Sequence, residues 1–489
     1  MKHLILFFAL YAVASSLRAF DRPNIIFILA DDMGYGDVQS LNSDSKIPTP
    51  NLNRLAAEGM SFTDAHSPSA VCTPTRYATL TGRYSWRSRL KSGVLNGYGT
   101  PLIETDRPTV ASHLKANGYH TAVIGKWHLG LGFQKHSNGE WDWTKPLTYS
   151  PVDVGFERSL VIPASLDFPP YVYIEGHKIT GLPDREQPAQ KFPAYLRKGE
   201  LGSNFSILNC LDVLAEKTAE HIKLSAKNKK PFFLYFPLTA PHKPVLPHPR
   251  FEGKTDLGPY GDFIVQVDWT VGRVLDAVDE AGISENTLII YTSDNGSFMY
   301  RETDGSIPDH VKDATVQAYF EGNHTANGSL RGTKADIWEG GHRVPFFARW
   351  PKVIKTKSKC DVPICHVDLF ATAAAVARTK LPSAAEAAPD SFSWLSLFQG
   401  KPQRFKRAPV VNHSAAGMFA VREGDWKLVL GNGSGGRQQP KGRRFTPPWQ
   451  LYNLKDDLSE TKDLYSAEPE VASRLEAALY KMLADERSR

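Results

Sequence analysis

The stretch that decides the fold is Asn24-Ile25-Ile26-Phe27-Ile28-Leu29, which is followed by the acidic pair Asp31-Asp32. A short apolar run rich in β-branched residues is typical of a buried strand, here one with polar chemistry at its carboxyl end. The same plan recurs at 120–124, 232–236 and 287–291. These runs lead into Gly125-Lys126-Trp127-His128, Thr239-Ala240-Pro241-His242 and Ser293-Asp294-Asn295.

Helical patterns alternate with these strands, at 49–59, 108–117, 211–227 and 263–281. Strands that alternate with helices predict an α/β fold with a large mixed, mostly parallel sheet sandwiched by helices. Ligands of such sheets gather at the carboxyl ends of the strands, and each polar cluster falls there. We therefore expect one site built from several distant segments.

The last part of the chain has a different character. Short strand-like runs at 419–422, 426–430 and 450–452 are followed by an amphipathic helical pattern over 468–484. They predict a small antiparallel sheet with a packed helix. We expect a main domain over 20–408 and an α+β subdomain over 409–489, with a mobile loop at 431–441, which is poor in apolar residues.

The first 19 residues have the order of a secretory signal peptide, with Lys2 and His3, an apolar run over 4–14, and small residues up to Ala19. A membrane anchor is the alternative, but the run is shorter than the about 20 residues that span a bilayer. We expect cleavage after Ala19, export to a periplasm, lumen or the exterior, and no stable membrane insertion.

Charge and cysteine usage limit the function classes. The formal charge of +6 is mild for 489 residues and its positive side chains are spread along the chain, which argues against nucleic acid as a partner and is compatible with an anionic substrate. Of the four cysteines, Cys360 and Cys365 could close a short loop, and Cys210 lies in an apolar run typical of a buried side chain. Cys72 is embedded in a motif.

That motif is Cys72-Thr73-Pro74-Thr75-Arg76, followed by Thr81-Gly82-Arg83. Pro74 suits the first turn of a helix, so we expect Cys72 just before that helix, where unpaired N–H groups favour an anion. Arg76, one turn later, can point back to the same end. The pattern Cys-x-Pro-x-Arg-x4-Thr-Gly-Arg resembles the signature of type I sulfatases of the alkaline phosphatase superfamily, and the resemblance extends over most of the chain.

The resemblance implies that a formylglycine-generating enzyme converts Cys72 to Cα-formylglycine. It also implies a metal site formed by Asp31, Asp32, Cys72, Asp294 and Asn295. Oxygen ligands of this kind suit Ca²⁺, or less well Mg²⁺, rather than zinc. Taken alone, such acidic pairs are more often helix caps or turns.

The remaining catalytic residues also follow from the resemblance. Lys126 would bind the sulfate and the formylglycine, and His128 would take the proton that lets the hemiacetal collapse. His242 and Lys334 would contact the sulfate and assist the leaving oxygen. Ser165 is a weaker match because its flanking residues depart from the family pattern. With these residues, the implied catalytic set is Cys72, Arg76, Lys126, His128, His242 and Lys334.

These expectations define an enzyme that releases inorganic sulfate from a sulfated small molecule or glycan. The alternatives are a phosphomonoester or phosphonate ester hydrolase of the same superfamily, and a non-catalytic glycan-binding protein in which Cys72 stays a thiol. Six aromatic and basic residues could stack on sugar rings and hold a polyanion or, alternatively, pack within the protein: Trp86, Arg87, Arg89, Tyr98, Tyr171 and Tyr173.

Overall fold

The computed structural model describes residues 22–191, 194–228, 230–299 and 324–489. Within these residues, ten strands form one sheet in the order β13-β2-β12-β11-β1-β10-β4-β5-β6-β7. The five neighbouring strands from β11 to β5 are parallel, and β12, β6 and the β12–β2 pairing are antiparallel. The predicted mixed, mostly parallel sheet is therefore confirmed. Its strands are β1 (Asn24–Asp31), β2 (Met60–Phe62), β4 (His120–Lys126), β5 (Arg158–Ile162), β6 (Ile174–Glu175), β7 (Lys178–Ile179), β10 (Phe232–Pro241), β11 (Thr287–Ser293), β12 (Phe346–Arg349) and β13 (Ser358–Cys360).

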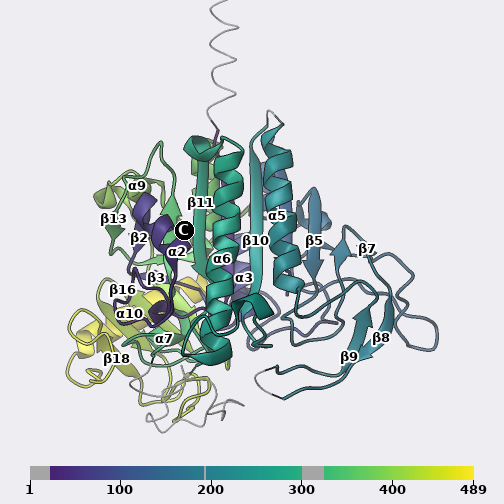
Figure 1. Cartoon of the computed structure of the whole chain (residues 1–489). Coiled ribbons are helices and arrows are strands. Elements are labelled where there is room, and N and C mark those ends of the chain that lie inside the picture. The colour runs from purple at the N-terminus through teal and green to yellow at the C-terminus, as the bar shows by residue number, and fades with distance from the viewer. Residues whose placement is uncertain (1–21, 192–193, 229, 300–323) are drawn as a thin grey trace, which may run out of the picture.

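Helices cover both faces of this sheet because each central strand is apolar on both sides. In β1, Ile26 and Ile28 belong to one core, whereas Ile25, Phe27 and Leu29 belong to the other. The helices are α2 (Pro50–Glu58), α3 (Cys72–Thr81), α4 (Val110–Ala116), α5 (Cys210–Ala226), α6 (Gly258–Glu280), α7 (Glu339–His342), α8 (Leu369–Val376) and α9 (Leu395–Phe398). Residues of α2, α5 and α6 line the first core and those of α3, α4 and α8 the second. Figure 1 shows α5 and α6 side by side along one face of the sheet.

The predicted elements of the main domain are present with small changes at their ends. The helix expected from residue 263 begins earlier, at Gly258, next to Pro259 in its first turn. Strand β10 continues to Pro241, so the run expected to lead into a polar loop stays in the sheet almost to His242. Two further pairs of short strands lie outside the large sheet: β3 (Ala65–His66) with β14 (Ile364–Cys365), and β8 (Pro183–Gln187) with β9 (Gly199–Gly202).

The C-terminal region forms the predicted antiparallel sheet, β15 (Val410–His413), β16 (Phe419–Glu423), β17 (Trp426–Val429) and β18 (Gln450–Asn453), on which α10 (Pro469–Ala484) packs. Segment 431–441, expected to be a mobile loop, is instead held against the main domain. The Ile337 amide donates to Ser434 O at 2.8 Å, and the Arg437 amide donates to Asp336 Oδ1 at 2.6 Å. Because glycine lacks a side chain, Gly436 can approach the Ala335 carbonyl, where a Cβ atom would lie 2.3 Å from the oxygen.

The remaining expectations concern the N-terminal segment, membrane insertion and the pairing of the cysteines. The predicted signal peptide, 1–19, lies outside the described residues. Among the residues that are described, no helix has the length and apolar character needed to cross a bilayer. All four cysteines are buried and free, so the loop closure considered for Cys360 and Cys365 is absent from the structure.

Candidate active site

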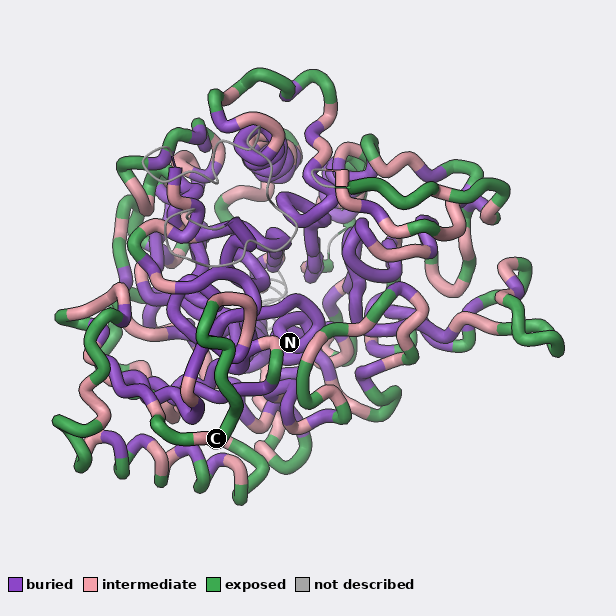
Figure 2. Tube along the Cα trace, turned by 90° about the horizontal axis from the view of Figure 1, so that it is seen from below, coloured by how far each residue is buried: buried purple, intermediate pink, exposed green. Residues whose placement is uncertain are grey.

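The carboxyl ends of four neighbouring parallel strands bring distant polar residues to one place. Asp31 ends β1, Lys126 ends β4, His242 follows β10, and Asp294 follows β11. These side chains are buried. In Figure 2, which looks at the molecule from below Figure 1, the buried residues gather in the middle of the chain trace. The sheet order thus joins segments that are far apart in the chain, such as Asp32 and Asp294, which are in contact although 262 positions separate them.

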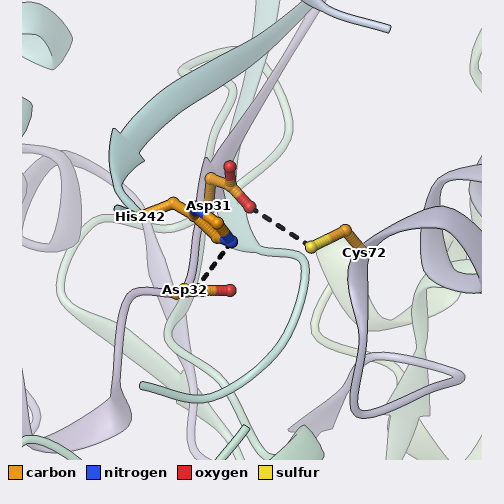
Figure 3. Close-up of side chains that lie close together, drawn as sticks. All are labelled: Asp31, Asp32, Cys72 and His242. Carbon is orange, nitrogen blue, oxygen red and sulfur yellow. Dashed lines mark hydrogen bonds and ion pairs between the residues drawn. The ribbon is translucent and has the colours of Figure 1, made fainter. Parts of the chain in front are cut away.

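Cys72 is the first residue of α3, one position further into the helix than expected. Val71 precedes it and provides no side-chain cap, so no N-cap side chain pairs with the first N–H groups of this helix. The Cys72 sulfur lies 3.6 Å from Asp31 Oδ1 and 3.6 Å from Lys334 Nζ. Figure 3 shows Cys72 pointing toward Asp31, with Asp32 and His242 beside them.

Three cations balance three carboxylates in the site. Lys126 Nζ lies 2.7 Å from Asp31 Oδ2, and Lys334 Nζ lies 2.7 Å from Asp32 Oδ2. Arg76 reaches back from α3 and places Nη2 2.6 Å from Asp294 Oδ2. Its Nη1 donates to the carbonyl of residue 126 at 3.0 Å, which fixes the guanidinium between the strands.

The oxygen atoms around Asp32 fit a hard divalent cation. Among the described residues, Asn295 Oδ1 is buried without a hydrogen-bond partner, although its amide nitrogen donates to Asp32 Oδ1 at 2.6 Å. Asp31, Asp32, Cys72 and His242 can direct ligand atoms to within 4.8 Å of one another. Carboxylate and amide oxygens are the ligands that Ca²⁺ and Mg²⁺ prefer. Asp31, Asp32, Asp294 and Asn295 could therefore hold such an ion.

Burial and charge set opposite pKa shifts on two carboxyl groups that share Arg76. Burial acts to raise the pKa of Asp31, but the positive charges of Lys126 and Arg76 act against it and the pKa lies below its usual range. Burial and the nearby Asp31 charge raise the pKa of Asp294 to about 7, against the attraction of Arg76. Burial also raises the pKa of the Cys72 thiol to about 12, so an unmodified Cys72 is a poor nucleophile at neutral pH.

The two predicted histidines line the same cavity as Cys72. His128 Nε2 is 2.7 Å from Leu95 O, and its Nδ1 is 3.5 Å from Ser165 Oγ. His242 Nδ1 is 2.6 Å from Lys243 O, and its Nε2 faces Asp32 Oδ2 at 3.5 Å. Burial and then nearby cations, Lys126 for His128 and Lys334 for His242, hold both pKa values well below the usual range, so both rings are neutral.

A cavity of about 330 Å³ opens above Cys72 and contains charged residues that the sequence did not single out. Asp167 and Arg197 come from the region around β6–β9, Lys243 follows β10, and Arg437 comes from the C-terminal subdomain. Ser165, the weaker match, also lines this cavity. No local pattern marks Arg437, because segment 431–441 resembles a solvent-exposed loop in composition.

The six residues considered for stacking on sugar rings do not line this cavity, as far as the described residues define it. Trp86 stacks on Tyr84 with ring centroids 5.4 Å apart, and Tyr173 packs on Phe205 at 4.5 Å. Arg87 is ion-paired with Asp390 at 2.9 Å. The remaining three have partners of their own: Arg89 with Thr100, Tyr98 with Glu200 and Trp141, and Tyr171 with the Arg197 carbonyl. These contacts favour the packing alternative for Trp86, Tyr171 and Tyr173, which are buried, whereas Arg89 is exposed.

Comparison with known proteins agrees with this geometry. A family model described as sulfatase matches residues 23–379. The chain is 34% identical to an N-acetylgalactosamine-6-O-sulfatase of Bacteroides thetaiotaomicron, with 94% of this chain and 92% of that protein aligned. It is 32% identical to arylsulfatase A of Bos taurus, over 94% of this chain and 87% of the relative.

A solved structure gives the same result for the fold. It comes from work on the metabolism of multiple glycosaminoglycans by Bacteroides thetaiotaomicron, and it superimposes with a TM-score of 0.82 at 31% identity. The superposition covers 94% of this chain and 99% of the other. By sequence and by fold, the chain belongs to the sulfatase family and is a sulfatase.

Proposed function

We propose that this sulfatase hydrolyses sulfate esters of a sulfated carbohydrate and releases inorganic sulfate by means of a formylglycine made from Cys72. The observation that carries the proposal is the place of Cys72 at the start of α3, with its sulfur 3.6 Å from both Asp31 and Lys334 at the floor of the cavity. A nucleophile there attacks a sulfate group that enters between a helix end and two lysines.

Formylglycine and a divalent cation would supply the chemistry that unmodified side chains lack. The hydrated aldehyde offers two hydroxyls on one carbon, one to attack sulfur and one to expel the sulfate afterwards. A Ca²⁺ ion, or less well Mg²⁺, held by Asp31, Asp32, Asp294 and Asn295 would neutralise negative charge at the same place. The buried oxygen of Asn295, which has no hydrogen-bond partner within the described part of the chain, supports this ligand set.

Three cations of the chain surround the nucleophile, and each is paired with a carboxylate. Lys126, Lys334 and Arg76 balance the charges of Asp31, Asp32 and Asp294. With a divalent cation held by the carboxylates, the site would be positive overall, so the same three side chains would stabilise the sulfate ester and the negative charge that develops on the leaving oxygen. Arg76 keeps the Asp294 carboxylate next to the nucleophile, where it accepts the proton of the attacking hydroxyl.

Two proton transfers complete the cycle. Burial opposes the charge on Lys334, but Asp32 raises the pKa of this lysine, so Lys334 is protonated and can donate to the departing alcohol oxygen. His242 is neutral in the ligand-free site and is the second donor once a bound anion favours its charged form. His128 is neutral as well and takes the proton that lets the second hydroxyl expel sulfate.

A sulfated glycan is the substrate class that the cavity supports best. Three cations, Arg197, Lys243 and Arg437, line its opening beyond the residues that face the nucleophile. A relative at 34% identity carries the name N-acetylgalactosamine-6-O-sulfatase, and the similar solved structure concerns glycosaminoglycans. The proposal includes export of the protein and its maturation by a formylglycine-generating enzyme.

Mass spectrometry of the Cys72 peptide tests the nucleophile, using protein made in a host that contains the maturation enzyme. We expect the aldehyde or its hydrate. Kinetics on the sulfate and phosphate esters of the same phenol then test the reaction, and we expect a higher kcat/KM for the sulfate ester. An unmodified thiol in active enzyme contradicts the proposed nucleophile, and a preference for the phosphate ester favours a phosphoester hydrolase.

A further inference from the structure

Asp167 is a buried carboxylate beside the nucleophile that the reaction above does not use. It lies in the segment that follows β5, its residue is 3% exposed, and it lines the same cavity as Cys72, His128 and His242. Its pKa is raised by burial, against the charges of Arg197 and Lys243. A charged group in such a place costs free energy, so its presence requires partners.

One carboxylate oxygen of Asp167 has such a partner. Oδ2 is paired with Arg197 Nη1, which also donates to the Asp167 carbonyl at 3.2 Å. The Arg197 guanidinium lies flat against Phe168, 3.9 Å from the centre of its ring. These contacts fix the carboxylate in one orientation before any ligand enters.

The other carboxylate oxygen of Asp167, Oδ1, lacks a hydrogen-bond partner in the described part of the chain. This oxygen is also buried. His242 Nδ1 lies 3.7 Å from this oxygen, but that distance is too long for a hydrogen bond, and the nitrogen already lies 2.6 Å from Lys243 O. Asp167 thus lines the cavity in which the sulfated group is placed, and its Oδ1 is a preoriented acceptor whose hydrogen bond is unmade.

We propose that Asp167 is a specificity-determining residue that accepts a hydrogen bond from a free hydroxyl of the sugar ring that carries the sulfate. The inference rests on the proposed function and refines its substrate class. A neutral hydroxyl fits because it donates to Oδ1 without adding negative charge. A second sulfate on the same position would meet a carboxylate instead of a cation, so the pocket selects rings that are unsulfated at that hydroxyl.

The first test uses the unaltered enzyme. kcat/KM is measured for a sulfated monosaccharide that the enzyme hydrolyses, for each of its monodeoxy analogues, and for 4-nitrophenyl sulfate, which has no sugar hydroxyl. We expect one deoxy position to lower kcat/KM by about 10- to 100-fold, the usual effect of losing a hydrogen bond to a charged group. Equal values for all deoxy analogues would overturn the inference.

The second test assigns that hydroxyl to Asp167. In Asp167→Asn, Arg197 selects the amide oxygen, so the amide nitrogen faces the cavity and cannot accept. We expect the ratio of kcat/KM for the sulfated sugar to that for 4-nitrophenyl sulfate to fall about 10- to 100-fold, and discrimination against the deoxy analogue to disappear. Asp184→Asn, on the exposed strand β8, is the control and should keep the discrimination of the unaltered enzyme.

The outcomes separate the two proposals. If the mature enzyme hydrolyses neither the sugar sulfates nor the aryl sulfate, the proposed function fails and this inference fails with it. If both are hydrolysed and Asp167→Asn keeps the deoxy discrimination, only the role of Asp167 is overturned.

Discussion

Two buried clusters of charged residues differ in how completely their members are paired. The active-site cluster consists of Asp31, Asp32, Cys72, Arg76, Lys126, His242, Asp294, Asn295 and Lys334. The subdomain cluster, between the main sheet and the C-terminal sheet, consists of Asp64, His66, Glu339, His342, Arg422, Lys427 and Glu460. In the latter, Lys427 Nζ lies 3.0 Å from Glu339 Oε1 and 2.8 Å from Glu460 Oε1, and Arg422 Nη2 lies 2.6 Å from Asp64 Oδ2.

This difference in pairing indicates a different role for each cluster. The active-site cluster contains an oxygen of Asn295 that has neither a hydrogen-bond nor an ion-pair partner among the described residues, and it opens into a cavity. In the subdomain cluster, Glu460 Oε1 accepts no hydrogen bond from a described residue either, but it is ion-paired with Lys427. In the same cluster, His66, His342 and Glu339 could direct ligand atoms toward a metal ion. However, Lys427 Nζ lies 3.2 Å from His342 Nε2, and Arg422 Nη1 lies 3.3 Å from His66 Nε2. These two positive charges oppose the binding of a cation. Charges that satisfy one another hold two subdomains together, whereas charges that leave oxygens free bind a ligand.

The largest expected effect is the loss of turnover in Cys72→Ala. Removing the nucleophile in the active-site cluster should lower kcat by more than about 10⁴-fold, measured as sulfate release from 4-nitrophenyl sulfate. Cys210→Ala is the matched control, since Cys210 is buried in the core at the start of α5, and it should keep the activity of each folded molecule. Full activity of Cys72→Ala would contradict the proposed mechanism.

Breaking the subdomain cluster should cost stability instead. Lys427→Met leaves Glu339 and Glu460 buried beside one another without their shared cation, so we expect the free energy of unfolding to fall by about 3–5 kcal/mol. Urea unfolding measures this change. Lys481→Met, which removes an exposed partner of Asp485, should change it by less than about 1 kcal/mol. If the two variants were equally stable, the cluster would not hold the subdomains together.

A divalent cation should stabilise the active-site cluster alone. After chelation, Ca²⁺ at a hundredfold excess over its Kd should raise the free energy of unfolding by about 2.7 kcal/mol, measured by thermal unfolding. The increment should vanish in Asn295→Ala and persist in Lys427→Met. An equal increment in all three proteins would place the ion outside the proposed ligand set.

The smallest expected effect is a loss of folding stability at low pH. Burial acts to raise the pKa of Asp64, but Arg343, Arg422 and His66 outweigh it and lower the pKa from 3.8 to about 2. Because the folded state holds this proton less tightly than the unfolded state, the contribution is present above about pH 4 and is lost as the pH falls toward 2.

The contribution of the Asp64 carboxylate to the free energy of unfolding is about 2 kcal/mol. The unfolding free energies of the unaltered protein and of Asp64→Asn should therefore converge by that amount between pH 4 and 2. Parallel curves would show that Asp64 does not titrate in this range. Asp184→Asn, which changes an exposed carboxylate outside both clusters, serves as the comparison.

Much of the fold and of the candidate site could be predicted from the sequence because those features are local. The apolar runs of β1, β4, β10 and β11 predict strands, and the polar residues at their carboxyl ends predict the edge of the sheet at which the site lies. Both predictions depend only on the residues of each run. The motif from Cys72 to Arg76 combines a helix start with a side chain that points back, so it too carries its own geometry.

Only the tertiary structure decided what surrounds these residues. The sequence contains no pattern that marks Asp167, Arg197 or Arg437, because each is recognisable only by the partner that another segment brings to it. The same holds for segment 431–441, which looks like a mobile loop until Asp336 and Ala335 bind its backbone. The sequence by itself determined which groups are candidates for the reaction, through short-range patterns. The shape of the cavity, on which the proposed choice of sugar depends, was decided by contacts between segments far apart in the chain.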